Sequence, residues 1–100
     1  MDTVREGVSV ERHVLPHGEA AAYEAALDVL AQLVGLAANR ISEEEAKPSP
    51  DAVEIERWRR RRDAWAARRR GLDPRASPAV HEVLDQDAAF LRSLIEAGRG

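Results

Sequence analysis

The feature that most constrains the fold is a wide apolar face in the first half of the chain. Between residues 19 and 46, apolar residues recur at intervals of three and four in two adjacent rows, as they do along one side of an α-helix. At 100° per residue, the two rows cover roughly 200° of the helix circumference. Such a face is wider than one neighbouring helix covers, so we expect a central helix contacted by two or more others. The rows are Tyr23, Leu27, Leu30, Val34, Ala37 and Ile41, and beside them Ala22, Ala26, Val29, Leu33 and Leu36.

A second helix is predicted to begin at a Ser-Pro pair. Serine is a favoured N-cap and proline is tolerated in the first helical turn, so Ser49 and Pro50 read as the start of a helix over residues 50–70. Gly71 is a typical stop, and Leu72 is placed for a Schellman-type contact after it.

A third helix is predicted to begin at Ser77-Pro78, which repeats this start signal, and to run over residues 78–97. Short connections favour antiparallel neighbouring helices. We therefore predict a mainly all-α fold in which helices 19–46 and 50–70 form a long hairpin and the third helix packs across it.

The apolar face also predicts self-association. One chain has too few helices to cover a face of this width, and a second copy would complete the core as a four- or six-helix bundle. The residues expected to meet across this homodimer are Tyr23, Leu27, Leu30, Val34 and Ile41.

The first 18 residues differ from the helical domain predicted over 19–100. Apolar and polar residues alternate from Val8 to Val14, which predicts a short strand. A lone strand leaves its backbone hydrogen-bonding groups unpaired. The segment therefore either pairs with the same segment of a second subunit or lies as an extended arm over the helices.

The end of the first helix is acidic. Glu44 and Glu45 fall on the arc that is apolar earlier in the helix, so we expect this end to leave the core. Consecutive glutamates on a helix point to different sides, which argues against a metal cage. A solvated tip, or a docking surface for a basic partner, is the expectation.

The most distinctive stretch is rich in arginine and tryptophan. Eight arginines and both tryptophans, Trp58 and Trp65, lie within residues 56–70. One interpretation is polyanion binding, with arginine on phosphates and tryptophan as a stacking platform. The interpretation that we favour is structural, because the two tryptophans share one helix face with other apolar residues. The candidate polyanion contacts are Arg57, Arg60, Arg61, Arg68 and Arg70.

Asp87 lies near the centre of the apolar face of the third helix. A buried carboxylate without a partner is costly, so we expect Asp87 to pair with Arg62 or Arg69, within the chain or across a dimer. The alternative is that Asp87 marks a site for a ligand or partner. Arg62 and Arg69 each follow a tryptophan by four residues, so we also expect them to stack on the indoles.

Composition and motifs argue against several function classes. The chain has 15 basic and 18 acidic residues and a formal net charge of −3, so it is not a polycation. It has no cysteine and no phosphate-binding glycine loop, and Pro16 argues against a helical metal pair of His13 and His17, which have i,i+4 spacing. We therefore expect no cofactor and no metal. No run of about 18 apolar residues and no signal-peptide pattern is present, so we expect no membrane association and a cytoplasmic location.

These observations favour a small non-catalytic helical protein that binds another protein. We expect a homodimeric adaptor, regulator or antitoxin/immunity-type partner. The alternative is nucleic-acid binding through the arginine-rich helix over residues 50–70, which predicts affinity with a steep salt dependence.

Overall fold

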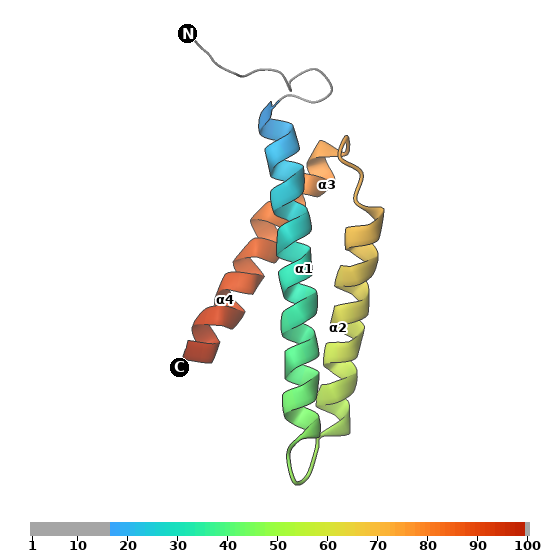
Figure 1. The fold of residues 1–100 in the computed structure, drawn as a ribbon, viewed down its shortest axis with the longest axis vertical. Coiled ribbons are helices and arrows are strands. Elements are labelled where there is room, and N and C mark those ends of the chain that lie inside the picture. Colours follow the sequence, from blue (N-terminus) through green and yellow to red (C-terminus); the bar gives the residue numbers. More distant parts are fainter. Residues whose placement is uncertain (1–16, 100) are drawn as a thin grey trace.

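The fold is all-α, as predicted, in a computed structural model that describes residues 17–99. Two long helices form an antiparallel hairpin, and the remaining helical turns cross one side of it (Figure 1). The bounds lie within two residues of those expected from the sequence, and the strand or arm predicted before residue 17 lies outside the described residues. The elements are α1 (His17–Glu45), α2 (Ala52–Gly71), α3 (Ser77–Glu82), the π-helical turn η2 (Val83–Asp87) and α4 (Ala88–Arg99).

The α1–α2 hairpin contains most of the core. On α1 the buried stripe runs between the two predicted rows, and its members at Leu30 and Leu33 have no exposed surface. On α2 the buried residues are Ile55, Trp58 and Trp65, so the prediction that both tryptophans belong to the core is confirmed. Burying a side chain the size of leucine stabilises the fold by roughly 1.5–3 kcal/mol. The hairpin is therefore the stable part of the molecule.

The acidic end of α1 stays in the helix and contacts the core, contrary to the expectation that it would leave. Glu44 is 8% exposed and continues the buried stripe of α1. Its Oε1 accepts a hydrogen bond from Lys47 Nζ at 2.8 Å, and its Oε2 accepts one from the backbone N–H of Asp51 at 3.0 Å. These two bonds lower the pKa of the Glu44 carboxyl, the one from Lys47 most. The sequence argument failed because the connection itself supplies the donors that a buried carboxylate needs.

Both predicted serine caps are wrong. The N-cap of α2 is Asp51, whose side chain accepts hydrogen bonds from the backbone N–H groups of Val53 and Glu54. Proline at position 50 therefore precedes the cap instead of following it. Ser77 begins α3 as its first residue and does not cap it; its hydroxyl donates to Glu19 Oε2 at 3.4 Å.

The predicted Schellman-type end of α2 does not form either. Gly71 is the last residue of α2, and the residue after it, Leu72, has an extended backbone with φ −71° and ψ 121°. Leu72 is nevertheless buried, so its contact with the core holds the end of the helix in place.

The third predicted helix is interrupted. Residues 77–99 form α3, then the π-helical turn η2, then α4. Val80 and Val83 are buried before and at the start of this turn, and Leu91 is buried after it. Beyond η2 the axis of α4 diverges from the hairpin (Figure 1). π-Turns often occur at functional sites.

Candidate functional site

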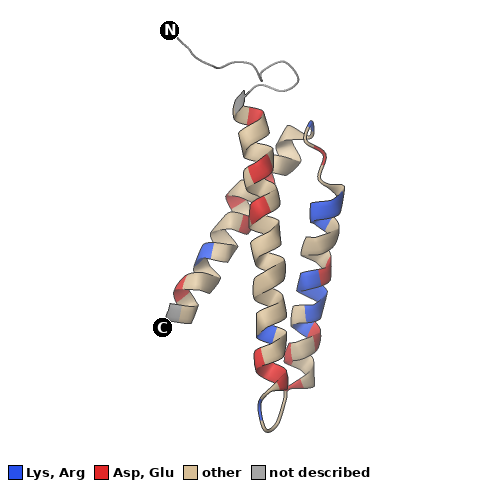
Figure 2. Ribbon diagram, in the orientation of Figure 1, with Lys and Arg blue, Asp and Glu red and all other residues tan. Residues whose placement is uncertain are grey.

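The arginines of α2 are largely engaged within the chain. Basic and acidic residues alternate along α2 (Figure 2), so most of the partners are neighbours on the same helix, and these side chains are exposed. Exposed pairs of this kind contribute little stability, with a median between 0 and about 1 kcal/mol. Each of these arginines is neutralised by a nearby carboxylate, but it can exchange that carboxylate for an anionic group of another molecule. The ion pairs are Arg57–Glu54, Arg59–Glu45, Arg60–Glu56, Arg62–Asp63 and Arg68–Asp87.

Trp58 is the centre of a different kind of cluster. The guanidinium carbon of Arg61 lies 4.8 Å from the centroid of its ring, and that of Arg40, from α1, lies 5.7 Å away. Arg61 also lies 5.6 Å from the ring centroid of Phe90 on α4. Three elements therefore meet at this point. We refer to Arg40, Trp58, Arg61 and Phe90 as the Trp58 cluster.

The predicted stacking of Arg62 and Arg69 on the tryptophans is wrong. Arg62 Nε donates to Asp63 Oδ1 at 3.1 Å, and Arg69 Nε donates to the backbone carbonyl of Leu27 at 3.2 Å. At 100° per residue, both lie on one flank of the tryptophan face of α2. The arginines that stack come from the opposite flank of the tryptophan face, and one of them belongs to another helix. Only the orientation of α2 against α1 and α4 decides which arginine reaches the ring.

Asp87 pairs with an arginine of α2, but within the chain this arginine is neither of those predicted. Arg68 Nη1 lies 2.6 Å from Asp87 Oδ2, and the Asp87 side chain is 14% exposed. Asp87 is the last residue of the π-turn η2, and the pairing across a dimer that was also expected stays a prediction. The pair joins the last turn of α2 to the end of η2, directly before α4.

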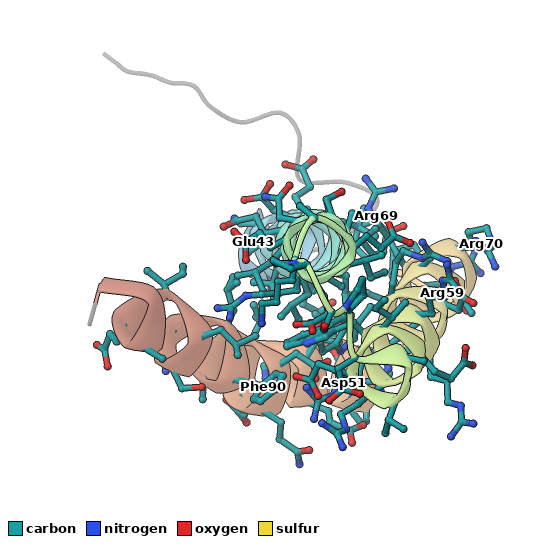
Figure 3. All side chains as sticks on the ribbon, turned by 90° about the horizontal axis from the view of Figure 1, so that it is seen from below. Glu43, Asp51, Arg59, Arg69, Arg70 and Phe90 are labelled. Atoms are coloured by element: carbon teal, nitrogen blue, oxygen red, sulfur yellow. The ribbon has the colours of Figure 1, made fainter. Side chains whose placement is uncertain are left out.

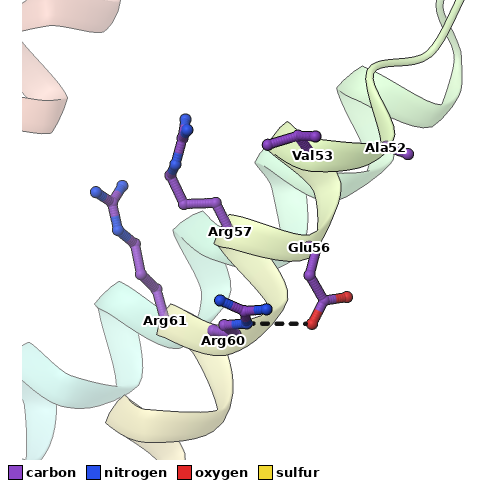
Figure 4. Close-up of a pocket in the computed structure, with 6 residues that line it drawn as sticks. All are labelled: Ala52, Val53, Glu56, Arg57, Arg60 and Arg61. Atoms are coloured by element: carbon purple, nitrogen blue, oxygen red, sulfur yellow. Dashed lines mark ion pairs between the residues drawn. The ribbon is translucent and has the colours of Figure 1, made fainter.

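The predicted polyanion contacts do not form one group. Arg57, Arg60 and Arg61 line an open hollow of about 530 Å³ along α2, together with Val53, which is 68% exposed (Figure 4). Arg68 is held by Asp87 nearer the other end of the helix. Arg70 lines a separate hollow between α1 and α2.

The predicted self-association residues are divided by the fold. Leu30 and Ile41 are buried inside the chain and are not available to a second copy. Tyr23, Leu27 and Val34 remain partly exposed along one side of α1. That side borders a hollow of about 250 Å³, which is lined by Ala31, Val34, Ala66, Arg69 and Arg70.

The Trp58 cluster and this accessible side of α1 face in opposite directions. Seen along the hairpin, Phe90 lies on one side of it and Arg69, next to the smaller hollow, on the other (Figure 3). We refer to Tyr23, Leu27, Ala31, Val34 and Ala38 as the α1 strip. A molecule with these two faces can contact two partners at once.

α1 is long and apolar enough to cross a membrane by length and composition alone. Core helices of soluble proteins meet the same criterion, so this finding does not decide where the protein resides. Its most apolar window is only 22% buried within the chain. Among residues 17–99, no group of three or more histidines, aspartates or glutamates is arranged to hold a metal ion.

Comparison with known proteins gives no relative from which a function could be transferred. No protein-family model, no curated protein and no solved structure matches this chain.

Proposed function

We propose that the protein is a non-catalytic, cytoplasmic helical interaction module that forms a homodimer and binds another protein. The observation that carries the proposal is that α1 has more apolar surface than the chain itself buries. No charged residue occurs on α1 from Val29 to Asn39, a stretch that Figure 2 shows without blue or red. The chain covers only part of it.

The α1 strip is the part of this surface that a second copy would cover. Its members are small or apolar and lie half-buried or exposed, with α2 along one border. Two such strips related by a twofold axis would bury the same residues on both subunits. Contact between helices rich in alanine brings backbones close together and gains dispersion energy. The proposed roles of an adaptor, a regulator or an antitoxin/immunity-type partner all use such an assembly.

The test is the mass of the purified chain in solution. Size-exclusion chromatography with light scattering at tens of micromolar should give twice the monomer mass. Val34→Glu places a charge within the apolar strip and should weaken the dimer at least tenfold. Asn39→Glu adds the same charge on the exposed polar side of α1 and should leave the dimer intact.

Two results would contradict the dimer. One is a wild-type monomer at these concentrations, and the other is an equal effect of Val34→Glu and Asn39→Glu. Flotation of the monomer with lipid vesicles would assign the apolar surface of α1 to a membrane instead.

The second candidate function is nucleic-acid binding through α2. It is favoured by the hollow at Arg57, Arg60 and Arg61, where the ion pairs of Arg57 and Arg60 are exposed and exchangeable. It predicts a mobility shift of duplex or single-stranded nucleic acid at about 50 mM salt that disappears steeply as salt rises. No shift at that salt concentration would eliminate it.

A further inference from the structure

Arg40 and Arg61 differ from the other arginines around α2 because both lie against the Trp58 ring. Neither forms an ion pair with another residue in the described part of the chain, and both are half-buried. Their contact with Trp58 is a cation–π contact. It uses the positive charge of the guanidinium and does not use up its in-plane N–H donors. Two sets of donors thus stand at one aromatic ring without an acceptor.

The surroundings of these two arginines are apolar on the side of α4. Phe90 lies beside Arg61 and is half-buried, as is Leu94 one turn farther along α4. Ile95 is 41% exposed, although it is large and apolar. α4 diverges from the hairpin in this region (Figure 1). The apolar face of α4 therefore continues past the point where the chain covers it.

A carboxylate beside apolar residues matches this arrangement better than a phosphate backbone does. A guanidinium forms a bidentate pair with a carboxylate, and the pair strengthens where water is partly excluded. A nucleic acid would need several free cations in a row, whereas most arginines of α2 already have partners. It would also bring highly charged phosphates against Phe90, Leu94 and Ile95, which offer them no hydrogen bond.

We infer that the Trp58 cluster and the apolar end of α4 form a docking surface for an acidic amphipathic helix of another protein. An aspartate or glutamate of that helix pairs with Arg40 or Arg61. Leucine, isoleucine or methionine side chains three or four residues away pack on Phe90, Leu94 and Ile95, which is the spacing of anchors on one helix face. This inference rests on the proposed function as an interaction module and names the class of partner.

The experiment is a selection from a display library of randomised amphipathic helices about five turns long. The full chain is the target, and recovered sequences are titrated against three variants. Arg40→Gln and Arg61→Gln remove one charge each from the Trp58 cluster. Arg59→Gln is the matched control, because it removes the same charge from an exposed side chain that pairs with Glu45, does not line the hollow of Arg61 and lies on the side of α2 away from Phe90 (Figure 3). Circular dichroism checks that each variant is folded.

The expected result is enrichment of helices with an acidic residue three or four positions from an apolar one. Binding should weaken at least tenfold in Arg40→Gln or Arg61→Gln and less than twofold in Arg59→Gln. Recovered helices without acidic residues, or an equal loss in the Arg59→Gln control, would overturn the inference. Displacement of the helices by duplex DNA at physiological salt, with the same arginine dependence, would assign the surface to nucleic acid instead.

The docking surface and the homodimer can be disproved independently of each other. A dimer that depends on Val34 and selects no acidic helix would leave the self-association proposal standing. A monomer that selects acidic helices through Arg61 would leave only the docking surface standing.

Discussion

The α1–α2 hairpin and the α4 segment are both amphipathic, yet the chain uses their apolar residues differently. α1 buries five apolar side chains and α2 buries three, whereas α4 buries only Leu91. In the hairpin, one apolar stripe of each helix is covered by the other helix, although the α1 strip stays accessible. In α4 the spacing continues while the partner diverges. Apolar periodicity thus shows that a face must be covered, and leaves open whether the same chain covers it.

The largest difference between the two regions is expected for leucine truncation. Leu30 has no exposed surface and lies in the centre of the hairpin core. Leu30→Ala should lower the free energy of unfolding by about 2–5 kcal/mol, because it removes buried carbon atoms and leaves a cavity. Leu94→Ala on α4 should cost clearly less, since Leu94 is half-buried. Equal losses in urea denaturation would mean that α4 belongs to the core as fully as the hairpin does.

The Asp87–Arg68 pair is a polar connection between the hairpin and η2, the turn that leads into α4. Removing it should lower the free energy of unfolding by less than Leu30→Ala does. Asp87 is mostly buried, while Arg68 is nearly half exposed, so the pair is partly screened by water. Asp87→Ala should lower the free energy of unfolding by about 1–2 kcal/mol. It should also increase amide hydrogen exchange in α4 more than in α1.

A double-mutant cycle checks this assignment. Asp87→Ala and Arg68→Ala should couple, whereas Asp87→Ala and Arg69→Ala should be additive within about 0.5 kcal/mol. Coupling to Arg69 instead would restore the pairing expected from the sequence. An unchanged melting temperature in Asp87→Ala would show that the pair does not hold α4 in place.

The sequence predicts the helices well because their signals are local. The bounds and the burial of Trp58 follow from periodicity and from breaks at proline and glycine. The Trp58 cluster could not be predicted, because Arg40 and Arg61 reach the ring only through the packing angles between helices. The burial of Glu44 had a weak signal, since Lys47 follows it by three residues beside the first proline of the turn. The π-turn at η2 has no signal that we recognise in the sequence.

The turn of the hairpin should respond to pH through Glu44. Its pKa lies below the ordinary value of 4.5, chiefly because Lys47 donates a hydrogen bond to it. A carboxyl with a lowered folded pKa stabilises the fold at pH values above 4.5, and this contribution is lost as the pH falls through the folded pKa. Glu44→Gln should therefore lower the melting temperature at pH 7, and the gap to wild type should close below pH 4.5.

The control for this prediction is Glu43→Gln, one residue earlier. Glu43 is exposed and forms no ion pair with another described residue. Its variant should follow the wild-type melting temperature across the same pH range. A gap for Glu44→Gln that persists unchanged at low pH would mean that shape, and not charge, secures the turn.

The smallest effect on stability is expected at Ile95, which separates a role in binding from a role in folding. Ile95 is 41% exposed, so Ile95→Ala removes little buried surface and should change the free energy of unfolding by less than about 0.5 kcal/mol. If the end of α4 is a docking surface, the same variant should weaken the binding of selected acidic helices severalfold. A large loss of stability with unchanged binding would instead place Ile95 in the core in solution. Ile95 would then contribute little to folding and much to binding, whereas the buried apolar residues of the hairpin contribute chiefly to folding.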